Sequence, residues 1–109
     1  MSERVIVADW RQTQTALQTA RQQGRAVFLC SPQGASAWLG AGFWKALQDK
    51  ADGQFADIEF TLALDCADRA GDVLAALRAG VRAIVFSGPT EVAEKLRDIA
   101  GQTGARVIA

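Results

Sequence analysis

Short apolar runs alternate along the chain with longer stretches in which apolar residues recur every three or four positions. The β-branched and aromatic residues of the apolar runs favour strands at 4–8, 26–30, 59–65, 82–87 and 106–108. The longer stretches have the spacing of amphipathic helices and lie at 12–23, 36–50, 68–79 and 89–104. The pattern therefore predicts the element order βαβαβαβαβ.

Single residues mark several of these boundaries. Gly24 and Gly80 follow two of the expected helices, where glycine commonly ends a helix. Asp68 is placed to cap the helix that runs to residue 79. Gly40 and Gly42 lie inside the second helical stretch, so we expect its first turn to be irregular or packed against backbone.

Strands that read as continuous apolar runs, separated by single helices, are typical of a parallel sheet covered on both faces. We therefore predict a three-layer α/β fold with an open, parallel, five-stranded sheet. The expected strand order is 2-1-3-4-5, as in flavodoxin-like domains, and the alternative is the Rossmann-like order 3-2-1-4-5. The first order lacks a fifth helix and leaves an apolar area open beside the first helix, which a homodimer could cover.

Composition limits the chemistry of this chain. Its 109 residues fit a single α/β domain, 1–109, and the hydrophobic fraction of 50% is ample for a packed core. A net charge of zero gives no electrostatic reason to expect nucleic acid or membrane partners. Because the sequence has no histidine, it excludes a Ser-His-Asp catalytic triad and any histidine-ligated metal site. We therefore predict no bound metal.

The compartment is inferred from two features. The start of the sequence has no basic segment followed by a long apolar stretch, so we expect no secretory signal. Cys30 and Cys66 are far apart and form no CxxC motif, which favours reduced thiols. Both features indicate a cytoplasmic protein.

The candidate site lies beyond the carboxyl ends of the strands, where open parallel sheets bind ligands. Asp9 and Asp65 end the first and third strands, which are neighbours in the order 2-1-3-4-5. Two such carboxylates could hold Mg²⁺ or share a proton, or each could cap the turn that follows it. The complete set of candidate ligand-binding residues is Asp9, Ser31, Asp65, Cys66, Ser87, Gly88 and Thr90.

The segment from Ser87 to Thr90 opens the fourth helix, where free N–H groups could receive a phosphate or a carboxylate. The alternative is an ordinary helix start. The glycine-rich segment from Ser31 to Gly42 contains no lysine and does not match a Walker A loop. Cys30 and Cys66 are expected about 10 Å apart in the order 2-1-3-4-5, which is too far for a disulfide.

The positions of Asp9, Asp65 and Ser87 resemble those of the response-regulator receiver domains. In that family, the third strand ends in the phosphoacceptor Asp and the fourth in Ser or Thr. The resemblance implies a phosphoacceptor role for Asp65. The chain departs from the family at Trp10, where a second acid is expected, and at its last strand, which ends without a lysine.

The segment from Leu74 to Gly88 resembles one unit of a (βα)₈-barrel enzyme. Its helix ends in Ala-Gly, and its apolar strand ends in Ser-Gly. A complete barrel needs eight such units, so this chain cannot close one by itself.

Three classes of function follow from these features. The leading hypothesis is a non-enzymatic interaction or regulatory module that forms a homodimer or binds a protein partner. The first alternative is a domain that binds a small anion or nucleotide at the carboxyl ends of the strands. The second is a degenerate, receiver-like phosphoacceptor at Asp65. The sequence identifies no cofactor.

Overall fold

The chain folds into one parallel sheet whose strands alternate with helices. The computed structural model describes residues 4–109, so the prediction about the first three residues, the absence of a signal segment, lies outside it. The strands are β1 (Arg4–Ile6), β2 (Val27–Cys30), β3 (Phe60–Asp65), β4 (Ala83–Val85) and β5 (Arg106–Ile108). The helices are α1 (Trp10–Gln23), α2 (Ala41–Gln54), α3 (Ala70–Ala79) and α4 (Thr90–Gly101), with a 3₁₀ turn at Ala35–Ala37. The predicted element order and the parallel sheet are confirmed.

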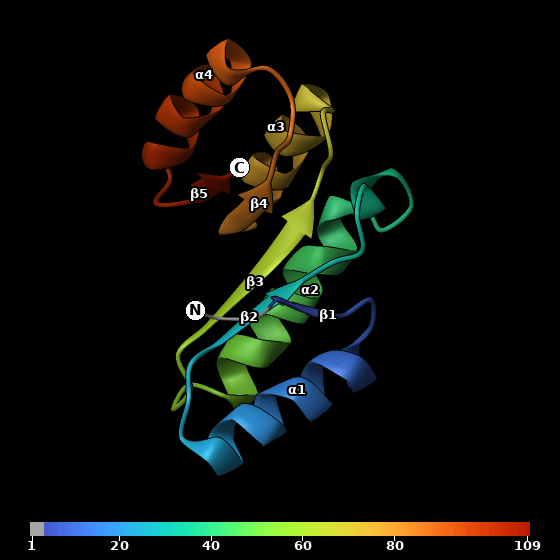
Figure 1. Cartoon of the computed structure of the whole chain (residues 1–109), viewed down its shortest axis with the longest axis vertical. Coiled ribbons are helices and arrows are strands. Elements are labelled where there is room, and N and C mark those ends of the chain that lie inside the picture. The colour runs from blue at the N-terminus through green and yellow to red at the C-terminus, as the bar shows by residue number, and fades with distance from the viewer. Residues whose placement is uncertain (1–3) are drawn as a thin grey trace.

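The strand order is β1-β2-β3-β4-β5, so the predicted order 2-1-3-4-5 is wrong, and so is the alternative 3-2-1-4-5. Every strand pairs in parallel with the one before it. Each new strand along the chain is therefore added at the same side of the sheet. Figure 1 shows the result, with α1 at one end of the molecule and α4 at the other.

All four helices cover the same face of the sheet. Right-handed crossovers that always step in one direction place every helix on one side. The main core accordingly combines the buried residues of all the helices with alternate strand residues, among them Leu29, Leu64 and Ile84. A second, smaller cluster contains strand residues alone and lies on the opposite face: Cys30, Ala63, Ala83 and Val85, flanked by Phe28 and Ile108. The predicted three-layer fold is thus corrected to two layers.

The side chains of β3 give the physical reason for this arrangement. Phe60, Leu62 and Leu64 pack into the main core, whereas Thr61, Ala63 and Asp65 point to the other face. The first set is large and apolar, and the second is small or polar. A helix packed on the second set would bury little apolar surface, so the helices form a layer only on the face that carries the first set.

The resemblance to receiver domains does not extend to the topology, because that fold needs the order 2-1-3-4-5. A sequential order with helices on one face is instead the local arrangement of (βα)₈-barrel units. The sheet here is open, with β1 and β5 as its edges.

Local signals set the helix boundaries only in part. Asp9 caps α1, and Gly24 ends it in the left-handed conformation with φ of 61°. Asp68 does not cap α3 as predicted. The residue before that helix is Arg69, whose side chain makes no capping hydrogen bond. The expected irregularity before α2 is confirmed by the 3₁₀ turn.

Among the described residues, the helices are all too short or too polar to cross a bilayer.

Gln48 links α2 to the turn before β4. Its side-chain Nε2 donates to the carbonyl oxygen of Gly80 at 3.0 Å, and its Oε1 accepts from the N–H of Arg82 at 2.9 Å. The Gln48→Leu substitution leaves both backbone groups without their partner. We expect it to lower the free energy of unfolding by about 2 kcal/mol, measured by urea denaturation. The matched control is Gln54→Leu at the exposed end of the same helix, which should change it little.

Candidate functional site

Asp65 and Ser31 lie together at the carboxyl ends of the adjacent strands β3 and β2, whereas the predicted order 2-1-3-4-5 would have separated them by β1. The Asp65 carboxylate accepts from the N–H groups of Gly34 at 3.0 Å and Ala67 at 2.8 Å. The Ser31 hydroxyl accepts from the N–H of Asp65 at 2.8 Å and donates to the carbonyl oxygen of Pro32. Both side chains are buried and hold the loops that follow their strands. Their hydrogen bonds are internal to the chain.

Arg69 extends this network across the rim of the sheet, which is the edge formed by the carboxyl ends of the strands. Its guanidinium donates to the carbonyl oxygen of Gly34 at 2.6 Å, to the Ser36 hydroxyl at 3.1 Å and to the Asp72 carboxylate at 2.8 Å. Ser36 also donates to Asp72 at 2.7 Å. The Arg69 hydrogen bond, with help from Ser36, lowers the pKa of Asp72 below its usual value. The sequence analysis assigned no site role to Arg69, Ser36 or Asp72.

Asp9 is separated from Asp65 by the whole of β2. Its carboxylate accepts from the N–H of Gln12 at 2.8 Å and caps α1. The strands that the two acids follow, β1 and β3, are two strand spacings apart, or about 10 Å. The prediction that these acids end neighbouring strands is therefore wrong, and a shared Mg²⁺ or proton has no geometric basis. Residues 4–109 bring no three His, Cys, Asp or Glu side chains together as a metal site.

Cys30 and Cys66 lie on opposite faces of the sheet. Cys66 belongs to the main core, whereas Cys30 belongs to the small cluster on the uncovered face. Both thiols are free and buried, but β2 and β3 are adjacent, so the predicted separation by two strand spacings is wrong. Burial raises the pKa of both thiols, in the case of Cys66 to about 11. A thiol in such surroundings is protonated at neutral pH and chemically inert.

The segment that opens α4 is joined to the Asp65 network through the backbone of Ala67. Ser87 and Thr90 are exposed, and Pro89 is the residue before the helix. The N–H of Ser87 donates to the carbonyl oxygen of Ala67 at 2.7 Å. Gly88 has a packing role, because a Cβ atom there would lie 2.3 Å from Cζ of the buried Phe86 ring. Throughout residues 4–109, every buried polar side-chain atom has a hydrogen-bond partner, so none is left aimed at a ligand.

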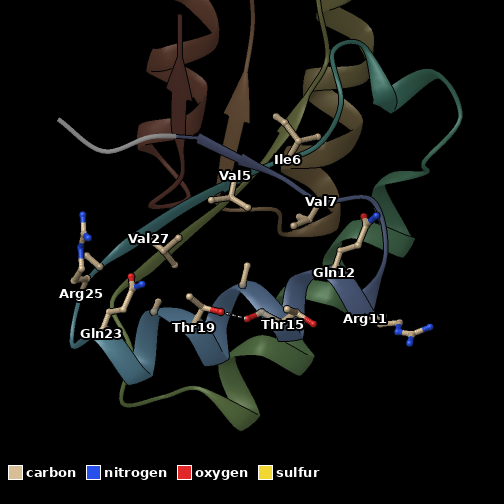
Figure 2. A pocket seen from close by; sticks show the side chains of 13 residues that line it. Val5, Ile6, Val7, Arg11, Gln12, Thr15, Thr19, Gln23, Arg25 and Val27 are labelled. Atoms are coloured by element: carbon tan, nitrogen blue, oxygen red, sulfur yellow. Dashed lines mark hydrogen bonds between the residues drawn. The ribbon is translucent and has the colours of Figure 1, made fainter.

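A cavity lies elsewhere, along α1 and the edge strand β1. It is a groove with a volume of about 1170 Å³. Figure 2 shows the strand above it and the helix below it, with Val5 over the stretch of α1 between Thr15 and Thr19. The groove is lined by Val5, Ile6, Val7, Arg11, Gln12, Thr15, Ala16, Thr19, Ala20, Gln23, Arg25, Ala26 and Val27.

The groove has an apolar floor and an uncharged wall. Val5, Ala16 and Val27 contribute to the floor, and Val5 is 38% exposed although it points to the helical face. The wall along α1 carries hydroxyl and amide groups, and residues 12–20 include no charged side chain. The charged residues, Arg11 and Arg25, stand at opposite ends of the groove (Figure 2).

The two edges of the sheet differ in their protection. At β5, the outward carbonyl oxygen of Val107 accepts from Nε of Arg97 on α4 at 3.3 Å. At β1, the N–H of Val7 donates to Cys30 of β2, so the alternate residues Arg4 and Ile6 direct their backbone groups outward. In the part of the chain that the structure describes, those groups have no hydrogen-bond partner, and the Ile6 side chain is 55% exposed.

Neither a protein-family model nor a curated protein sequence matches this chain. The site must therefore be interpreted from its own geometry. The open apolar area that the sequence analysis expected beside the first helix followed from the order 2-1-3-4-5, which is wrong, and the residues of the groove were not identified. The signal that marks them is the uncharged run 12–20 on an exposed helix.

A substitution at Asp65 tests whether this carboxylate has the structural role described above. Asp65→Ala removes the acceptor for two backbone N–H groups, and we expect it to lower the free energy of unfolding by about 2 kcal/mol or more. Asp68→Ala is the matched control, because Asp68 is exposed in the same loop. Chemical denaturation measures both. Equal stability of the two variants would contradict the structural role.

The buried thiols make a second prediction. In the folded protein at pH 8, iodoacetamide should label neither Cys30 nor Cys66, because both are buried and protonated. After unfolding in guanidinium, both should react quickly. Intact-mass spectrometry counts the adducts, and rapid labelling of the folded protein would show that a thiol is accessible.

Proposed function

We propose that this chain is a non-enzymatic protein-interaction module whose binding surface is the groove along α1 and β1. The observation that carries the proposal is the coincidence, at one edge, of three features: a large groove lined in part by apolar side chains, an exposed strand edge and a helix wall without charge over residues 12–20. Protein surfaces of this kind are used when another chain adds a strand or helix to a sheet edge.

The polar rim supports the other two candidate functions less well. The Asp65 carboxylate already accepts two backbone N–H groups, and the nearby arginine already bonds to Asp72, Ser36 and Gly34. A phosphoacceptor or an anion site at this rim would have to break these bonds. The free N–H groups at the start of α4 have no second feature beside them that points to a ligand.

In-cell photocrosslinking tests the proposal. A p-benzoylphenylalanine residue is placed at Thr19 in the groove, in the full chain expressed in its own cells. We expect ultraviolet light to produce covalent protein adducts, because this side chain is exposed on the proposed binding surface. Denaturing electrophoresis and mass spectrometry identify the adducts.

The matched control carries the same probe at Asp98, an exposed position on α4 at the other end of the molecule. It should give only background. The proposal is overturned if the Thr19 position gives no protein adduct, or if both positions give the same pattern.

A further inference from the structure

We infer that the groove is filled by a second copy of this chain, in a twofold dimer that pairs β1 with β1 and α1 with α1. This inference rests on the proposed function and names its partner. The two sheets would join into one continuous sheet, with the helices of both copies on the same face. The same surface on each copy forms the contact, as twofold symmetry requires.

The backbone of β1 is suited to antiparallel pairing with itself. Arg4 and Ile6 direct their N–H and C=O groups outward, and Val5 lies between them. With the twofold axis at Val5, Arg4 of one copy faces Ile6 of the other, and both pairs exchange hydrogen bonds. Val5 then meets its own copy on the helical face, which buries its exposed side chain.

The spacing of strands and helices fits the same arrangement. Within one copy, α1 connects β1 to β2 and packs against β2, while the groove lies on its β1 side. Joining the two β1 strands makes the two α1 helices face each other across the groove, at least two strand spacings or about 10 Å apart. Packed helices lie about 8–10 Å apart, so side chains of the two helices come within reach of each other there. Small side chains at Ala16 and Ala20 allow this approach.

The chemistry of the α1 wall is self-complementary. Threonine and glutamine side chains both donate and accept hydrogen bonds, so they can pair with their own copies. Val5 lies over the stretch between Thr15 and Thr19 (Figure 2), which places Thr15 of one copy opposite Thr19 of the other. The same register places Arg11 opposite the uncharged Gln23, so the cations at the groove ends do not meet each other.

The inferred dimer also uses the less protected of the two sheet edges. The carbonyl oxygen at the β5 edge is already bound by Arg97, whereas the β1 edge has no such cover among residues 4–109. A partner with a strongly charged helix would find no opposite charge along residues 12–20. A second α1 presents the same neutral wall.

Analytical ultracentrifugation of the purified full chain tests the inference. We expect a mass twice that of the single chain, in a concentration-dependent equilibrium. The double variant Thr15→Glu/Thr19→Glu sets like charges opposite each other twice across the axis. It should weaken dimerisation about a hundredfold or more. Both positions are exposed on a helix, where glutamate is well tolerated, so the fold should be retained.

A charge swap tests the antiparallel register. In Thr15→Lys/Thr19→Glu, each lysine faces a glutamate of the other copy, so dimerisation should be restored. The control Gln14→Glu/Gln18→Glu has the same spacing and charge as the weakened variant, but neither position lines the groove. It should remain dimeric. Hydrogen exchange provides an independent readout: the N–H of Ile6 should become protected as protein concentration rises.

The outcomes separate this inference from the proposed function. A chain that stays monomeric at all accessible concentrations, or a dimer that persists in Thr15→Glu/Thr19→Glu, overturns the second copy as the occupant. If the Thr19 photocrosslinks then contain a different protein, the interaction function stands and only its partner is wrong. If those crosslinks are absent as well, both proposals fail.

Discussion

The unequal size of the side chains on the two faces of the central strand β3 is the constraint on which this structure depends. In β3, large apolar side chains point to the helical face and small or polar ones point to the other face, on which other strands also place Phe28 and Ile108. Apolar burial is the main favourable contribution to folding, so the helices pack where it is greatest. Each right-handed crossover then steps in the same direction, and the strands follow one another in sequence order.

This order leaves the two outer strands half covered, since each helix covers the space between two consecutive strands. The same tripeptide, Arg-Val-Ile, forms both edges. Its valine is 38% exposed in β1 and 7% exposed in β5, where Arg97 of α4 reaches over the edge. The difference between the edges therefore comes from neighbouring helices and not from strand sequence. It leaves the β1 edge less protected than the β5 edge.

Much of the fold could be predicted from the sequence, because apolar residues recur with the periodicity of helices and strands. Glycine residues also mark the ends of two helices. The strand order could not be predicted, since all the runs looked uniformly apolar. In β3 the alternation of Leu62 and Leu64 with Ala63 and Asp65 carries the missing information. The candidate site, too, could be predicted from the sequence only in part. Asp65 and Ser31 were each placed where their strand ends, but the predicted order separated the two strands, and their partners are backbone groups that only the folded loops bring into reach.

The sequential order also has a consequence for how the chain assembles. Each strand contacts the strand immediately before it along the chain, so each strand pairing closes a loop that contains a single helical segment. Pairing of strands farther apart along the chain would close longer loops at a greater entropic cost. The stability of such an array also resembles a sum of neighbouring units. Its β1 end, which is the least covered, should open and close independently of the rest more readily than the centre at β3.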